Sequence, residues 1–260
     1  MPITYSSYLR LPELLELQTP ASDPPEHDET LFIVVHQVYE LWFKQILHEL
    51  DRMQVLLDSD DDSRVRHTFK RVLTILKVLV DQIDILETMT PLEFLSFRDR
   101  LDSGSGFQSA QFRALEFKLG IKRESAVKHY PAGSEGHRML SQRYGEPSLW
   151  DSFLHYLARH GYAVPQELLD RDVTQPVEPS EPLQKILIDA YRNDLVARDL
   201  SERLVDLDEG VQEWRYRHVR MVERTIGFKR GTGGSAGAAY LRETLFKHAF
   251  PDLWTIRTEL

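Results

Sequence analysis

The chain has 260 residues, 42% of them hydrophobic, with no cysteine and a formal net charge of −9. The lack of cysteine excludes disulfides, thiolate catalysis, zinc–thiolate sites and iron–sulfur clusters, and the negative charge disfavours nonspecific binding to nucleic acid or an acidic membrane. Neither an apolar signal segment nor an apolar run near the ~20 residues that span a membrane is present, so we expect a cytoplasmic protein.

Helical periodicity dominates the first half of the chain. Apolar residues recur every three or four positions over residues 28–58 and again over about 63–86, which predicts two long helices joined at the acidic run 58–62. The sequence Thr-Pro-Leu-Glu at 90–93 predicts the start of a short helix, with threonine as N-cap and glutamate completing a capping box. A further helix is predicted over 107–119, with Gly120 as its C-cap.

The middle of the chain is less regular. Residues 122–147 are expected to be irregular, with at most a short helix, and residues 148–160 are expected to form a helix that ends at Gly161. Several prolines in residues 164–180 predict a loop.

The C-terminal part returns to helical periodicity. A helical stretch is predicted from about 181 to 226, with a possible break at Gly210, and a final helix from 238 to 247 follows a glycine-rich loop. No segment alternates between apolar and polar residues as a strand would. We therefore predict an all-α protein, a single-domain helical bundle over residues 1–260, whose core is a natural place for a cofactor.

Two histidines lie on apolar helical stripes. His36 shares a face with Phe32, and an imidazole among aromatic rings suits contact with a flat apolar ligand. His218 lies on a stripe with Trp214, where a neutral imidazole could bind haem iron while the surrounding arginines meet the propionates. Spacing alone favours the plainer interpretation that each is a core histidine hydrogen-bonded to a carbonyl and that the arginines face solvent.

Two further features are chemically ambiguous. Arg98 follows Phe97, and a guanidinium beside aromatic rings suits capture of a carboxylate, but an ordinary ion pair explains it equally well. Residues 231–236 match the pattern G-x-G-x-x-A, yet a predicted helix precedes them, whereas a dinucleotide site requires a strand. This glycine-rich loop could close over a ligand or be a surface connector.

Four segments together resemble the tryptophan 2,3-dioxygenase family, whose members are haem enzymes that open the indole ring of tryptophan. The segments are residues 5–11, 27–44, 90–109 and 214–234. They occur in the family's order over nearly the whole chain, and the second and fourth are long and specific. One small departure is Ser6, where the family has glycine.

The resemblance implies a role for each matching residue. His218 would be the axial ligand of the haem iron, His36 would be the catalytic distal histidine that accepts a hydrogen bond from the indole N–H, and Arg98 would bind the substrate carboxylate. The other matching residues are Phe32, Phe94 and Phe97 in the walls of the indole pocket, Gly231 and Thr232 at the amino-acid end of tryptophan, Ser105 near the haem, and Tyr5, Tyr8 and Leu9 in an N-terminal segment (residues 1–20) that contacts a neighbouring subunit.

The resemblance also implies an activity: a ferrous haem b enzyme that inserts both atoms of O2 across the indole C2–C3 bond of L-tryptophan. The product would be N-formyl-L-kynurenine, in the first step of the kynurenine pathway, and the protein would be a homotetramer.

Two alternatives stay open. A related dioxygenase could act on another indole or aromatic amine, although a substrate without a carboxylate would leave the Arg98 guanidinium buried and uncompensated. A haem-binding sensor or carrier is the other alternative, but it would not need both an aromatic pocket and a carboxylate clamp.

Overall fold

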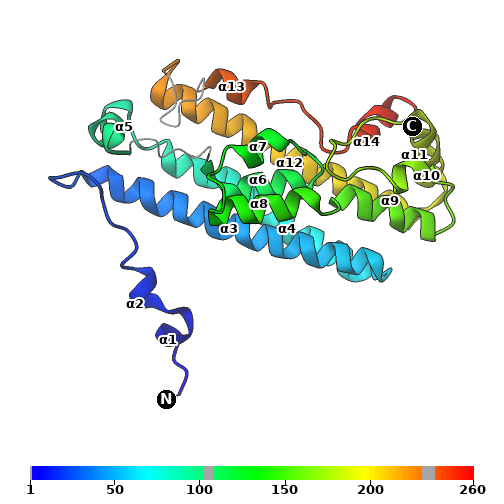
Figure 1. The fold of residues 1–260 in the computed structure, drawn as a ribbon, viewed down its shortest axis with the longest axis horizontal. Helices are drawn as coiled ribbons and strands as arrows, with labels where there is room; N and C mark the ends of the chain where they lie inside the picture. The colour runs from blue at the N-terminus through cyan, green and yellow to red at the C-terminus, as the bar shows by residue number, and fades with distance from the viewer. Residues whose placement is uncertain (1, 102–107, 230–237) are drawn as a thin grey trace.

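Three long helices form the framework of the molecule. The computed structural model describes residues 2–101, 108–229 and 238–260, and no strand occurs within these ranges. Helix α4 (Asp62–Leu86) packs against both α3 (His27–Asp58) and α12 (Leu195–Ile226), and the three run side by side in Figure 1. The predicted all-α fold is confirmed.

The two predicted N-terminal long helices form because their apolar stripes face one another. On α3, Ile46, Leu50 and Met53 are fully buried, and on α4, Val65 and Val72 are fully buried as well. Burial of each such side chain stabilises the fold by about 1.5–3 kcal/mol. The acidic turn also forms as predicted, because the Asp61 side chain accepts a hydrogen bond from the Arg64 N–H and caps α4.

The break in the C-terminal helical stretch lies at Asp194, so the expected break at Gly210 is wrong. Helix α11 (Glu181–Asn193) ends at Asp194, whose carboxylate accepts hydrogen bonds from the next helix's first N–H groups and starts α12. Gly210 lies inside α12, where an added Cβ would be 3.1 Å from Cδ1 of Leu76. This glycine therefore permits close packing of α12 on α4.

Residues 122–147 contain more helix than the sequence predicts. Helix α8 (Glu135–Gly145) begins at Ser134, whose hydroxyl accepts from the His137 N–H, and it buries Leu140 while packing on α6 (Ala110–Lys118). The expectation of an irregular segment was wrong here because the helix owes its stability to a neighbour distant in sequence.

Several short helices complete the chain, and some differ from expectation. The segment 164–180, predicted to be a loop, contains the one-turn helix α10. The helix predicted over 238–247 ends earlier, as α13, and a further helix, α14, follows it. The remaining elements are α1 (Tyr5–Leu9), α2 (Leu11–Leu14), α5 (Pro91–Arg98), η1 (Asp99–Leu101), α7 (Glu124–Lys128), α9 (Leu149–Arg159), α10 (Gln166–Leu169), α13 (Ala238–Arg242), α14 (Pro251–Thr255) and η3 (Ile256–Thr258). Within the described ranges, no helix has the length and apolar character of a membrane span.

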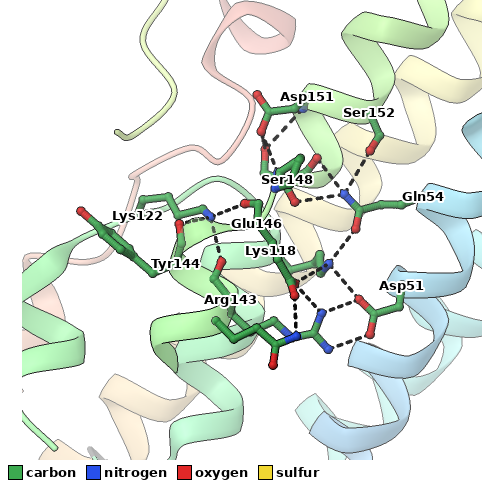
Figure 2. Close-up of polar contacts among 12 residues, drawn as sticks. Asp51, Gln54, Lys118, Lys122, Arg143, Tyr144, Glu146, Ser148, Asp151 and Ser152 are labelled. Carbon is green, nitrogen blue, oxygen red and sulfur yellow. Dashed lines mark hydrogen bonds and ion pairs between the residues drawn. The ribbon is translucent and has the colours of Figure 1, made fainter. Parts of the chain in front are cut away.

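A polar network joins α3, α6, α8 and α9 (Figure 2). The buried Lys118 ammonium lies 2.8 Å from the Asp51 carboxylate and donates a 2.6 Å hydrogen bond to Gln54. Lys122 donates to three carbonyl oxygens at the C-terminus of α8, at 2.6 to 2.9 Å. Burial lowers the pKa of Lys122 to about 8. Lys122 thus supplies hydrogen-bond donors to the carbonyl groups that the C-terminal end of α8 leaves unsatisfied.

The N-terminal segment projects away from the helical body (Figure 1). Neither α1 nor α2 has a buried residue, and Tyr5 and Tyr8 are 77% and 75% exposed. The segment meets α3 at Gln18, which donates a 2.6 Å hydrogen bond to Gln37. Its aromatic side chains are thus held out from their own chain.

Candidate active site

Helix α5 places aromatic side chains at the end of the bundle where α3 begins and α12 ends (Figure 1). Its start is fixed locally, as predicted: Thr90 and Glu93 form a capping box, and Pro91 occupies the first turn. Contacts with both α3 and α12 then hold the short helix in position.

Three phenylalanines from α3 and α5 pack together where the resemblance predicts an indole pocket. The ring centroid of Phe32 lies 5.7 Å from that of Phe94 and 5.5 Å from that of Phe97. Phe94 and Phe97 meet edge to face at 5.4 Å, the geometry preferred by aromatic quadrupoles. Phe97 is fully buried, whereas Phe32 and Phe94 are half-buried. The three predicted wall residues are therefore brought together, with part of their surface open to a ligand.

His36 adjoins this pocket in a defined tautomer. Its ring centroid is 4.0 Å from that of Phe32, and its Nδ1 lies 2.7 Å from the Phe32 carbonyl oxygen. A carbonyl oxygen can only accept, so Nδ1 carries the proton and Nε2 is the acceptor nitrogen. Burial lowers the pKa of His36, which keeps the ring neutral.

His218 on α12 is also a neutral imidazole. Burial, with smaller contributions from the charges of His36 and Arg113, lowers its pKa to about 4. Trp214, one turn before His218, contacts Tyr39 and Phe43 of α3. Within the described part of the chain, no hydrogen bond reaches either ring nitrogen of His218. Its lone pair is therefore suited to a metal ion.

The plane of the His218 ring is fixed by Trp214, a role that the sequence reasoning missed. The two rings stack 5.1 Å apart with an interplanar angle of 7°. Trp214 is itself enclosed by aromatic rings of α3 and α6, including Phe112 at 4.7 Å and Phe43 at 5.9 Å. The spacing of four residues between Trp214 and His218 puts them on one helix face, and this signal could have identified the pair.

A buried ion-pair cluster anchors the same segment of α12 to α6. Glu116 is 2% exposed and pairs with Arg215 at 2.7 Å, Arg113 at 2.6 Å and Arg123 at 2.5 Å. Burial opposes ionisation, but the three arginines outweigh it and lower the pKa of Glu116. Arg215 also donates to the Thr244 carbonyl at 3.3 Å. The cluster therefore holds the residue next to Trp214 in place.

The arginines around His218 all have carboxylate partners, so they give no support to the possible contact with haem propionates. Each guanidinium is paired within the protein, and the pairs are Arg215 with Glu116, Arg217 with Asp84 and Glu87, Arg220 with Glu223, and Arg224 with Glu87.

The remaining predicted site residues divide into three groups. Arg98 is the half-buried last residue of α5, directly after the pocket residue Phe97. Tyr5, Tyr8 and Leu9 lie on the projecting helix α1, away from the body of their own chain (Figure 1). Ser105, Gly231 and Thr232 lie outside the described residues.

Fold and site together define an all-α protein with a phenylalanine cluster beside the neutral His36, and with a second neutral histidine, His218, stacked on Trp214. The sequence profile of the family described as tryptophan 2,3-dioxygenase matches residues 1–142 and 183–260. The chain belongs to the tryptophan 2,3-dioxygenase family.

Relatives named tryptophan 2,3-dioxygenase align along almost the whole chain. The protein from Herpetosiphon aurantiacus is 61% identical over 258 residues, which cover 99% of this chain and 98% of the relative. The protein from Anaeromyxobacter sp. (strain K) is 57% identical over 258 residues, covering 99% and 96%. The protein from Arthrobacter sp. (strain FB24) is 44% identical over 261 residues, covering 99% and 92%.

Proposed function

We propose that this chain is a haem-dependent dioxygenase that inserts both atoms of O2 across the indole C2–C3 bond of L-tryptophan. The product is N-formyl-L-kynurenine, and the reaction opens the kynurenine pathway of tryptophan degradation. Membership of the family supports the reaction class. The observation that carries the proposal is a neutral His36 against the Phe32 ring, together with a neutral His218 that stacks on Trp214.

The residues around His218 fit a haem b group. Among the described residues there is no cluster of three or more histidine, aspartate or glutamate side chains that could hold a bare metal ion. Haem iron needs few protein ligands, because the porphyrin supplies the others, and a neutral histidine is a common axial ligand. His218, with its ring plane set by Trp214, would hold the iron. Bound ferrous haem would supply the activation of O2.

His36 orients the substrate in this proposal. Its Nδ1–H donates to the Phe32 carbonyl, so its Nε2 is available to accept a hydrogen bond from the indole N–H. Indole N–H is a very weak acid, and a neutral imidazole with a lowered pKa is too weak a base to remove that proton outright. We infer that His36 holds the indole in place and is not an obligatory base.

Arg98 and the phenylalanines fix the other parts of tryptophan. The guanidinium of Arg98 binds the substrate carboxylate through paired charge-assisted hydrogen bonds, while Phe32, Phe94 and Phe97 enclose the indole. Together these contacts orient the C2–C3 bond, and much of the rate enhancement comes from that positioning. The assignment of Gly231 and Thr232 to the amino-acid end of tryptophan, and of Ser105 to the haem, remains a prediction.

The whole chain acts as one domain within a homotetramer. The N-terminal segment, residues 1–20, completes the pocket of a neighbouring subunit through Tyr5, Tyr8 and Leu9. The exposure of these side chains on a helix that has no buried residue supports this arrangement. We place the enzyme in the cytoplasm, with tryptophan and its own copies as partners.

A tryptophan assay under reducing conditions tests the proposal. The protein is expressed with haem supplementation, and formation of N-formylkynurenine from L-tryptophan is compared with turnover of tryptamine. We expect tryptophan to be consumed and tryptamine to react far more slowly, because tryptamine has no carboxylate for Arg98. Comparable turnover of tryptamine would indicate a dioxygenase for another indole amine. A haem spectrum without any consumption of tryptophan would indicate a sensor or carrier.

A further inference from the structure

The orientation of the His218 ring depends on its stack with Trp214. A histidine that binds a metal ordinarily donates its second ring N–H to a carboxylate or a carbonyl, and that hydrogen bond fixes the plane of the ring. Among the described residues, none hydrogen bonds to His218. The parallel contact with Trp214, at 5.1 Å and 7°, holds the ring instead. Whatever fixes Trp214 therefore also fixes the plane of the imidazole.

One support of Trp214 is an ion pair made by the next residue of α12. The Arg215 guanidinium donates to Glu116 Oε1 of α6 at 2.7 Å, and both side chains are buried. Because a buried guanidinium is costly without its counter-charge, α12 cannot rotate at this turn without breaking a favourable pair. The pair thus holds the turn of α12 from which the Trp214 indole projects.

A second support passes from the same carboxylate through an aromatic ring of α6. Glu116 Oε2 accepts from the Arg113 guanidinium at 2.6 Å. That guanidinium lies 5.1 Å from the centroid of the Phe112 ring, within the range of cation–π attraction. The Phe112 ring lies 4.7 Å from the Trp214 indole. Glu116 therefore acts on the indole through two separate contacts, one along α12 and one along α6.

The two supports share a single negative charge. Without the Glu116 charge, the buried guanidinium groups of Arg113 and Arg215 would lose their shared counter-charge. A buried charge without a partner is strongly unfavourable, so both guanidinium groups would move towards water or other acceptors. Both supports of Trp214 would then change together, and only its edge-to-face contacts with Tyr39 and Phe43 of α3 would remain from those described here.

We propose that Glu116 is a positioning residue of the haem site: it sets the plane in which His218 presents its ring nitrogen to the iron. The inference rests on the haem ligation proposed above. Glu116 acts through Trp214 and needs no contact of its own with the cofactor. The retention of haem and the orientation of the axial imidazole should therefore both depend on this carboxylate.

Two measurements on the full-length haem-loaded protein test the role of Glu116. Haem release is followed by transfer to an excess of haem-free globin. The electron paramagnetic resonance g values of the ferric protein with cyanide report the orientation of the imidazole plane. We expect Glu116→Gln to release haem about tenfold faster and to shift the g values, because outer residues that orient a metal ligand have effects of this size.

A matched control separates positioning from a general loss of stability. Asp151 of α9 is also a buried carboxylate, and it pairs with Arg171 at 2.6 Å. Asp151→Asn should change haem release less than about threefold and leave the g values as in the wild type. Equal effects of Asp151→Asn and Glu116→Gln on both measurements would overturn the proposal.

A double variant tests whether the effect passes through Trp214. In a Trp214→Leu background, adding Glu116→Gln should change haem release less than about twofold and should not shift the g values further, because the link is already lost. Unchanged g values in Glu116→Gln alone, or an equal effect with and without Trp214, would overturn the proposal. If Glu116→Gln does not fold, Phe112→Leu removes the α6 support alone, and unchanged g values in that variant would overturn it.

Failure of the haem ligation itself would look different. In that case His218→Ala would keep the wild-type haem spectrum, which overturns the ligand assignment and the positioning role together. With His218 shown to be the ligand, wild-type g values in Glu116→Gln overturn the positioning role alone.

Discussion

His218 differs from an ordinary core histidine because no described residue hydrogen bonds to its ring nitrogens. His36 illustrates the contrast: its Nδ1 is bound by the Phe32 carbonyl, one turn earlier on the same helix. His218 thus keeps a ring-nitrogen lone pair that suits a metal. His36 keeps one acceptor nitrogen, Nε2, that suits a substrate N–H. Both are neutral because burial penalises the imidazolium form.

Substitution at two positions should separate haem binding from substrate binding. We expect His218→Ala to lose haem and Arg98→Ala to keep a normal haem spectrum while its tryptophan affinity falls at least about tenfold, because a charge-assisted carboxylate contact is lost. Arg100→Ala, at an exposed arginine two residues further on, is the matched control. Haem titration and equilibrium tryptophan binding measure both effects. A normal haem spectrum in His218→Ala would disprove the ligand assignment.

The half-buried imidazole of His218 should make the haem-free protein sensitive to mild acid. Its pKa is about 4 in the folded chain and 6.5 for an ordinary histidine, so between these values the unfolded chain binds more protons. The free energy of unfolding should therefore decrease as the pH falls from 6.5 towards 4.

Urea denaturation at several pH values measures this dependence. The decrease should be smaller in His218→Leu and unchanged in His67→Leu, which removes an exposed histidine of α4. If the free energy of unfolding depended on pH identically in the wild type and in His218→Leu, a neutral His218 with a lowered pKa would be contradicted.

At the scale of elements, the ion pairs between α6 and α12 depend on one carboxylate, that of Glu116. Glu116→Gln keeps the side-chain size but leaves the paired arginines without a counter-charge, so we expect the free energy of unfolding to fall by about 3–5 kcal/mol. Glu124→Gln, which breaks an exposed pair with Lys128, should change it by less than about 1 kcal/mol. Urea unfolding monitored by circular dichroism compares them. A similar decrease in the free energy of unfolding in the two variants would show that the Glu116 cluster contributes little to stability.

Elements whose signals are local could be predicted from the sequence. The capping box at Thr90, between residues three positions apart, is found as expected, and so is the turn at the acidic run 58–62, where Asp61 caps α4. The break at Asp194 was missed because Gly210 is the residue with the weaker helical propensity, and only its packing on α4 explains its place inside α12.

The candidate site was predictable as a set of residues but not as an arrangement. Residue spacing alone could not distinguish His36 and His218 from core histidines, and the resemblance to a family supplied their roles. The pairing of Arg215 with Glu116 joins residues 99 positions apart, so no periodicity could indicate it. The stacking of Trp214 on His218 could not be predicted from their shared helix face alone, because Trp214 is also held by Phe112 of α6, a segment distant in sequence.

At the scale of the whole molecule, the N-terminal segment should contribute to catalysis without contributing to folding. Deletion of residues 2–17 removes helices that have no buried residue, so the remaining chain should keep its helical circular dichroism and thermal unfolding midpoint. We expect kcat/KM for tryptophan to fall at least about tenfold, because in the proposed tetramer a neighbouring subunit's pocket would lose Tyr5, Tyr8 and Leu9. Sedimentation velocity establishes whether assembly survives. Unchanged kcat/KM in the deletion would refute a role for the segment in the active site.

The parallel stack of Trp214 on His218 has an optical consequence. In the proposed haem-bound protein, an indole stacked on His218 would be close enough for its excited state to be quenched by energy transfer to the porphyrin. Of the chain's four tryptophans, Trp214 should therefore lose its emission most completely on haem loading, and Trp214→Phe should diminish that change. The residue that orients the imidazole thus also makes cofactor occupancy visible in the protein's own fluorescence, with no need for turnover.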